Sequence, residues 1–251
     1  MKTFSNYFII LFIAGIFSTG CKNTTITTGS GSVKIEGNGK IVSEKRDISA
    51  FNAISISGVF NVILEQGSRE SIKVETDENI LPAIITVVKD DTLKVKMRDS
   101  TSIHKMSKLN VYITLVSISN INTVGVGSLK CANTMHLKDL DLNLEGVGLT
   151  SLNLEADKLN VKSEVVGALS LTGVVKETSI NHNGVGVIQA FDLKSEKLTL
   201  HSNGIGAAQV FASQEIIIDA SGLGGVEYKG GAAKKQINNS GIGKVVCVDC
   251  K

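Results

Sequence analysis

The 251-residue chain is long enough for one or two domains with a sizeable core, because 42% of its residues are hydrophobic and 20% are charged. It has 25 glycines, one proline, no tryptophan and only 4% aromatic residues, which favours strands and tight turns and leaves few surfaces on which sugars or bases could stack. The net charge is +2 and no run of Lys or Arg stands out, so we expect no nucleic-acid partner.

Residues 1–20 have the pattern of a signal peptide, with Lys2 at its charged start. The apolar run from Tyr7 to Phe17 is too short to span a bilayer comfortably. The tripeptide Ser18-Thr19-Gly20 before Cys21 resembles a lipobox, with serine where a leucine is usual. We therefore expect cleavage before Cys21 and a lipid on this cysteine that makes the membrane a partner. An ordinary signal peptide with an unmodified Cys21 is the alternative.

Residues 21–32 predict a flexible tether between the lipid and the fold. The stretch from Lys22 to Ser32 is polar, small and without apolar periodicity. No Asp follows Cys21, and by resemblance to known sorting rules this disfavours retention in the inner membrane. We expect an outer-membrane lipoprotein, on the periplasmic face or at the cell surface.

Residues 33–118 predict an irregular β section that caps one end of the fold or forms a joined β domain. Apolar and polar residues alternate here in short runs, as in half-buried strands, but without a fixed longer period. Asp77 to Pro82 predicts a single helical turn between strands. The expected strands are 51–58, 59–65, 72–75, 84–88, 93–97 and 109–115.

Residues 119–251 carry a sequence repeat built on Gly-x-Gly, in which alternating apolar residues flank the glycines. One copy is degenerate, with Val165 in place of the first glycine. The spacing between copies is 18 to 21 residues. The second glycines of the seven copies are Gly127, Gly148, Gly167, Gly186, Gly206, Gly224 and Gly243.

Two short strands joined by a glycine corner cannot bury their apolar sides alone, so the units must stack. The prediction is an all-β, right-handed parallel β-helix (β-solenoid) with coils of about 19 residues and, at the spacing of neighbouring strands, a length of roughly 30 Å. The glycines supply positive φ or close backbone approach at each corner. No copy precedes a helical pattern and no Asp recurs after the glycines, so neither a phosphate-binding loop nor a calcium-binding repeat is expected.

The chain resembles the GIN-domain family, which is described as a family of auto-transporter adhesin head domains and is common among predicted lipoproteins of Bacteroidetes. The resemblance runs from Phe51 to the C-terminus, and Val165 departs from the family's usual corner. It implies a superhelix similar to the pectate-lyase β-helices without their catalytic residues, and a role in adhesion. Its carriers are the motif Phe51-x-x-Ile54-x-Ile56-x-Gly58, the turn Gln66-Gly67, the stretch from Asn79 to Leu93, and the serial Gly-x-Gly corners.

Residues that precede each corner should form a ladder, with one rung per coil. Within it, Glu145 and Glu164 would bring two carboxylates about 5 Å apart, which could raise one pKa or hold a cation. The alternative is two solvated glutamates that splay apart. Asn183 and Asn203, farther along the ladder, predict an amide pair that stabilises stacking.

The remaining candidates are histidines, aromatics and cysteines. His182 and His201 differ by one position relative to their corners, so alternation predicts opposite faces and no shared metal site. Phe191 and Phe211 each follow their second glycine by five residues and should stack, either packed in the core or on a face, or as a shelf on which a ligand stacks. Cys247 and Cys250 could form a terminal disulfide if a turn brings them together, with unpaired thiols or redox or metal chemistry as alternatives.

We therefore expect a lipid-anchored, non-enzymatic protein of the cell envelope, without a cofactor, that serves in adhesion or as a binding scaffold. Its partner would be an envelope protein or a polysaccharide. One alternative is a polysaccharide-active or carbohydrate-binding β-helix with Glu145 and Glu164 as its site. Another is a purely structural module.

Overall fold

The computed structural model describes residues 33–249, which lie within one compact unit, Ser32–Lys251. The predicted signal peptide, the tether, Cys21 and Cys250 fall outside the described residues.

The described chain is all-β, as predicted. Its one helical element is the 3-10 turn η1 (Leu81–Ala83), which overlaps the helical turn expected over 77–82. The strands are β1 (Val33–Glu36), β2 (Ile41–Arg46), β3 (Ala53–Gln66), β4 (Ser71–Asp77), β5 (Ile84–Lys89), β6 (Thr92–Met97), β7 (Thr101–Lys105), β8 (Leu109–Leu115), β9 (Asn120–Cys131), β10 (Met135–His136), β11 (Asp139–His182), β12 (Val185–Ser202), β13 (Ile205–Ala220), β14 (Val226–Lys229), β15 (Lys234–Asn239) and β16 (Val245–Cys247).

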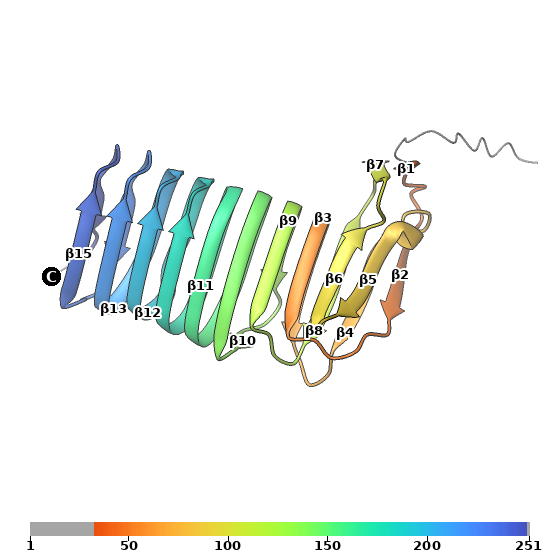
Figure 1. Ribbon diagram of the computed structural model, residues 1–251, viewed down its shortest axis with the longest axis horizontal. Coiled ribbons are helices and arrows are strands. Elements are labelled where there is room, and N and C mark those ends of the chain that lie inside the picture. The colour runs from red at the N-terminus through yellow and green to blue at the C-terminus, as the bar shows by residue number, and fades with distance from the viewer. Residues whose placement is uncertain (1–32, 250–251) are drawn as a thin grey trace, which may run out of the picture. The chain divides into compact units, whose positions relative to one another are not determined.

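Parallel pairing joins strands that lie one repeat apart, because the same pattern of apolar residues and glycines returns in each repeat. Gly148 of β11 pairs with Gly127 of β9, and Gly186 of β12 pairs with Gly167 of β11 and Gly206 of β13. Successive turns of the chain therefore lie side by side, in chain order, from β9 to β15 (Figure 1).

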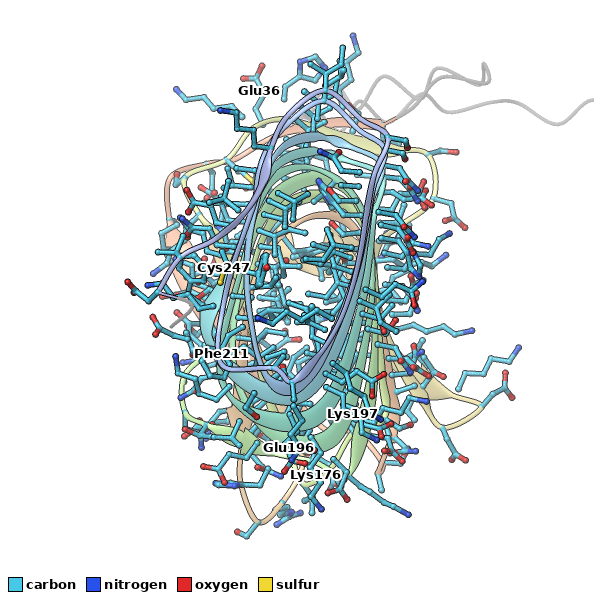
Figure 2. The ribbon with its side chains drawn as sticks, turned by 90° about the vertical axis from the view of Figure 1, so that its left-hand side faces the viewer. Glu36, Lys176, Glu196, Lys197, Phe211 and Cys247 are labelled. Atoms are coloured by element: carbon cyan, nitrogen blue, oxygen red, sulfur yellow. The ribbon has the colours of Figure 1, made fainter. Side chains whose placement is uncertain are left out.

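The core lies inside this stack of turns and follows from the alternation of the strands. Leu140, Leu142 and Leu144 are buried on one side, and Leu152 and Leu154 are buried on the other. Seen along the stack, the backbone of successive turns surrounds an interior filled with side chains (Figure 2). Each repeat thus adds a layer to one continuous core.

The stack also includes β3, which the Gly-x-Gly repeat does not predict. Gly58 pairs with Gly125, and Val59 pairs with Val126. Phe60 takes the place of the second glycine, and the segment between β3 and β9 contributes β4 to β8 instead of the next turn. The spacing Ile54-x-Ile56-x-Gly58 nevertheless matches Leu142-x-Leu144-x-Gly146 and could have identified this turn.

Residues before β9 form a mixed arrangement against β3. Parallel β6 and β8 lie beside β3, while the pairs β4–β8, β2–β4 and β5–β6 are antiparallel. Arg46 of β2 donates hydrogen bonds to the carbonyl oxygens of Ile84 and Leu81, at 2.6 and 3.1 Å. This guanidinium ties β2 to the segment around η1.

Asp77 fixes two loops at this end of the molecule. Its carboxylate is fully buried and accepts hydrogen bonds from the backbone N–H groups of Gly39 (2.7 Å) and Ser107 (2.8 Å) and from the Ser107 hydroxyl (3.0 Å). The Ser107 N–H contributes most to holding the pKa of Asp77 below its usual value, and the other hydrogen bonds act in the same direction.

The lowered pKa of Asp77 predicts acid sensitivity. Because the folded state favours the carboxylate, its stabilising contribution is complete above the ordinary pKa, about 3.9, and is lost as the pH falls through the lower folded-state pKa. Asp77→Asn should melt at a lower temperature than the parent at pH 7, and the gap should narrow as the pH falls below 4. Thermal melts across this range measure the gap, and a pH-independent difference would contradict the assignment.

At the other end, β15 pairs with a single strand of the described chain, β13. Its Lys235 and Asn239 are in register with Ile216 and Ala220, which point into the core. The last described layer therefore places a charged and a polar side chain at inward positions directly beside Ile216 and Ala220. Inward-pointing charge is a known protection of an exposed sheet edge.

Candidate functional site: the glycine corner and its ladders

The middle residue of each corner is aliphatic and points outward. These eight side chains, which we call the aliphatic ridge, are between 43% and 75% exposed. Neighbouring members pair in register along the stack, and the close approach of Gly167 to the Gly148 backbone continues the series within β11. The ridge consists of Val59, Val126, Val147, Val166, Val185, Ile205, Leu223 and Ile242.

The flanking glycines make this close stacking possible. Gly206 has a φ of +134°, and a Cβ placed on it would lie 1.7 Å from the carbonyl oxygen of Gly186. Hydrogen bonds between turns continue through the corner, as in the bonds from the Ile205 N–H to the Gly184 carbonyl and from the Leu223 N–H to the Gly204 carbonyl, both 2.9 Å. The corner thus exposes apolar side chains while its backbone remains hydrogen-bonded.

The amide ladder beside the ridge is confirmed. The Asn203 amide donates to Asn183 Oδ1 at 3.2 Å, and the Ser221 hydroxyl donates to Asn203 Oδ1. The Asn183 amide in turn donates to Asn181 Oδ1 at 3.1 Å. These bonds link three successive turns outside the core.

In the same column Glu145 pairs in register with Val124, and Glu164 follows one turn later. Lys162, two residues before Glu164 and not among the predicted site residues, forms an ion pair with it at 2.9 Å. The hydrogen bond and charge of Glu164 raise the pKa of Lys162, and the charge of Glu145 adds to this effect. The Lys162 ammonium therefore offsets part of the negative charge of the two glutamates.

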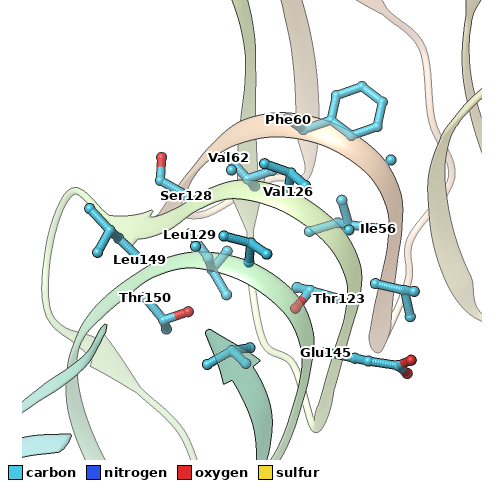
Figure 3. A pocket seen from close by; sticks show the side chains of 17 residues that line it. Ile56, Phe60, Val62, Thr123, Val126, Ser128, Leu129, Glu145, Leu149 and Thr150 are labelled. Carbon is cyan, nitrogen blue, oxygen red and sulfur yellow. The ribbon is translucent and has the colours of Figure 1, made fainter. Parts of the chain in front are cut away.

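A small cavity of about 50 Å³ lies behind the first corners, between β3, β9 and β11 (Figure 3). Ile56, Thr123, Leu129 and Thr150 are among its lining residues, and Glu145 points away from them. The volume suits a few waters and is far below the roughly 300 Å³ at which small-molecule sites begin.

His182 is a buried member of the inward column, whereas His201 is on the outward face, partly exposed, and pairs with Asp219 at 3.1 Å. The predicted opposite faces are confirmed. Nδ1 of His182 lies 3.3 Å from the Ser163 hydroxyl, and within the described part of the chain its buried Nε2 has no hydrogen-bond partner. Burial lowers the pKa of His182, so the folded state favours the neutral ring.

The lowered pKa of His182 predicts a loss of stability below neutral pH. The unfolded chain takes up this proton near pH 6.5, so the contribution is complete above that value and is lost as the pH falls toward the lower folded-state pKa. We expect the melting temperature of His182→Asn to vary less than that of the parent between pH 7.5 and 5. The exposed His104→Asn is the control, and an equal change in both variants would refute the assignment.

A ladder of alternating charge runs along one outward face. Glu177, Lys197, Glu215 and Lys234 pair in register through four successive turns, and Lys197 lies 2.9 Å from Glu177. The hydrogen bond between these two lowers the pKa of Glu177 and raises that of Lys197. A shallow hollow of about 260 Å³ lies over this ladder. Exposed pairs stabilise little, but alternating signs disfavour pairing in a shifted register.

The sequence was compared with models of known protein families. The family described as "Putative auto-transporter adhesin, head GIN domain" matches residues 50–232. The chain belongs to the GIN-domain family. The resemblance inferred from the residues is thereby confirmed. No curated protein matches the sequence.

Three solved structures of similar proteins come from Bacteroides and Parabacteroides species. A "putative adhesin" from Bacteroides fragilis is 26% identical, with a TM-score of 0.81 over 85% of this chain and 100% of its own. A "putative adhesin" from Parabacteroides distasonis is 25% identical, with a TM-score of 0.62 over 85% and 100% of the two chains. A "putative lipid binding protein" from the same species is 24% identical, with a TM-score of 0.64 over 85% and 99%.

The aromatic pair of this GIN domain is covered by lysines. Phe191 and Phe211 are half-buried on neighbouring strands. The ammonium of Lys194 lies 4.5 Å from the Phe211 ring centroid, and that of Lys229 lies 4.4 Å from the Phe191 ring centroid. The rings therefore contribute cation–π contacts that fasten the last turns.

Three further points concern cysteines, metals and membrane spans. Cys247 is disulfide-bonded, and its predicted partner Cys250 lies outside the described residues. Cys131 is a free thiol that accepts a hydrogen bond from the Asn153 N–H at 3.0 Å.

Residues 33–249 contain no group of three His, Cys, Asp or Glu side chains placed to hold a metal. The same residues contain no helix able to cross a membrane.

Proposed function

We propose that this GIN domain is a lipid-anchored, non-enzymatic binding scaffold of the cell envelope, built as a right-handed β-helix. The observation that carries the proposal is that outward side chains of successive turns lie in register along the stack, as in the amide ladder and the charge ladder. Parallel pairing one repeat apart supports the β-helix. Membership of an adhesin-head family supports binding.

Repeated columns suit a partner that is itself extended. One outward column carries Ser151, Ser170, Gln189 and Gln209 on neighbouring turns, and the charge ladder occupies the other face. At a spacing of about 4.8 Å between turns, such columns can make the same hydrogen bond many times along one polymer or strand. An envelope protein or a polysaccharide would be bound by the sum of these weak contacts.

Binding can be tested with a full-length Cys21→Ser chain, immobilised and exposed to purified envelope proteins and polysaccharides. We expect retention of a defined component that weakens when Gln189 and Gln209 are both changed to Lys. Lys194→Gln, on a neighbouring part of the same face, is the control. Absence of retention across all fractions would overturn the binding role and favour a purely structural module.

The anchor has a separate test in cells. We expect a fatty-acid label to enter the parent protein and not Cys21→Ser, and the parent to fractionate with the outer membrane. Equal labelling of both proteins, or a parent protein that fractionates as soluble, would refute the anchor and leave the binding scaffold standing.

The polysaccharide-active alternative rests on Glu145 and Glu164. Lys162 neutralises part of their charge, and a general acid or base would have to act beside that ammonium. We expect the Glu145→Gln, Glu164→Gln double variant to match the parent on every glycan tested, with Glu177→Gln, Glu215→Gln as the matched control. Bond cleavage by the parent that only the first pair abolishes would establish the enzyme instead.

A further inference from the structure

The aliphatic ridge forms the centre of a wider uncharged strip. The column that follows the second glycine adds Leu149 (54% exposed) and Val187 (38% exposed), together with Ala168 and Ala207. From Gly58 to Gly225 the corner and this column contain no charged residue. The eight turns of the ridge, at about 4.8 Å per turn, give it a length of roughly 34 Å. Exposed apolar strips of this kind mark interaction sites.

The backbone beneath the strip suits an environment without water. Hydrogen bonds between turns pass through the corner itself, including that from the Gly224 N–H to the Ile242 carbonyl at 2.8 Å. A hydrocarbon medium tolerates only backbone whose polar groups are bonded internally. The corner therefore presents aliphatic side chains and already satisfied backbone, which fits an apolar partner better than a polar polymer.

The described chain begins near Val59, the first residue of the ridge. Lys96 pairs with Ser57, a Cβ on Gly58 would lie 3.6 Å from Met97, and the Val33 N–H donates to the Ser100 carbonyl. Figure 1 shows β1 and β7 toward the side of the stack where β11, β12, β13 and β15 end before their glycine corners, and Figure 2 shows Glu36 of β1 on the side opposite Glu196. The eleven residues from Lys22 to Ser32 can span at most about 40 Å when extended. A lipid on Cys21 would thus hold the ridge within reach of its bilayer.

We propose that the aliphatic ridge rests on the lipid surface of the membrane that holds Cys21, so that the stack lies along the bilayer. This inference rests on the proposed lipid anchor. The eight ridge side chains form a single column on a convex corner, which offers a rigid second copy only a line of contact instead of the broad patch of a stable protein interface. A fluid lipid surface can adapt to such a corner, whereas a rigid second copy cannot.

The absence of tryptophan makes a direct test straightforward. Val147→Trp places a single reporter on the ridge, and Glu196→Trp places one at the opposite corner, where Figure 2 shows Glu196. Each lipidated protein is reconstituted in vesicles of phosphatidylethanolamine with a minority of phosphatidylglycerol, some of it brominated on the acyl chains. We expect a blue shift and strong quenching for Val147→Trp and neither for Glu196→Trp. Equal emission from the two reporters would overturn the proposal.

Chains without the lipid test the contribution of the ridge to membrane binding independently of the anchor. In a Cys21→Ser background, Val147→Trp should still shift when vesicles are added. Val126→Asp, Val185→Asp should weaken this partitioning by roughly tenfold for each valine removed, while the matched side-face pair Ser151→Asp, Gln189→Asp should not. A failure to label Cys21 with fatty acid would refute the anchor even if this shift persists. A shift that needs no vesicles and grows with protein concentration would assign the ridge to a second copy and overturn the proposal.

Discussion

Gly206→Ala is expected to lower the free energy of unfolding by about 4 kcal/mol, a large share of the 5–15 kcal/mol typical of folded domains. The backbone at φ +134° is open to glycine almost alone, which costs an alanine roughly 1–3 kcal/mol. The added Cβ would also meet the Gly186 carbonyl oxygen, so adjacent turns must separate at a further cost of similar size. Denaturant unfolding followed by circular dichroism measures the loss.

Gly231→Ala is the matched control for this substitution. No atom lies within 4 Å of a Cβ at Gly231, and its φ is outside the left-handed range. Its unfolding free energy should stay within about 0.5 kcal/mol of the parent. If Gly206→Ala were as stable as Gly231→Ala, the close stacking of the corners could not be what demands glycine.

The sequence was most informative where one short pattern recurs. Gly-x-Gly fixes a corner by local chemistry, so the positions of Gly127 through Gly243 predicted which residues pair between turns. The hydrogen bond from the Asn203 amide to Asn183 Oδ1 follows directly from that register. Period and alternation together were enough to place residues in the repeated region.

Pairing across a long insertion could not be predicted in the same way. β3 joins β9 through residues 67 positions apart, as in Gly58 and Gly125, and Phe60 hides the glycine signature. The hydrogen bonds of Asp77 to Gly39 and Ser107 likewise depend on loops without a periodic signal. Such contacts are set by the tertiary packing of distant segments.

The candidate site was only partly predictable for a related reason. Alternation predicted that His182 and His201 face opposite sides of the strand. It did not say which of the two is buried. His182 follows the buried Leu144 and Ser163 at intervals of one repeat, and this spacing indicates that His182 is the buried one. The partner of Glu164, Lys162, lies two residues away on the same strand, so the pattern of residues one repeat apart does not reveal it. The aliphatic middle residues of the corners were visible in the sequence, but their exposure depends on how sharply the chain turns at each glycine.

Lys235→Ile, Asn239→Ile is expected to convert the described C-terminal end of the stack into a self-associating edge. Together with Ile237, the two new side chains would extend the apolar core to an uncovered layer above Ile216, Ile218 and Ala220. The backbone of β15 has one partner strand among the described residues, so the edge beside this layer is available for pairing. Sedimentation velocity should show larger species that grow with concentration, relative to the parent chain.

Gln236→Ile, Asn238→Ile adds the same two side chains to β15 at positions in register with Ile217 and Asp219, which face outward from the stack. It controls for added hydrophobicity and should sediment like the parent. If both doubles associated to the same extent, apolar surface alone would explain the effect. Association of the inward pair alone would show that the polar last layer keeps the growing end of the stack closed, because only that pair makes the end resemble the interior of another turn.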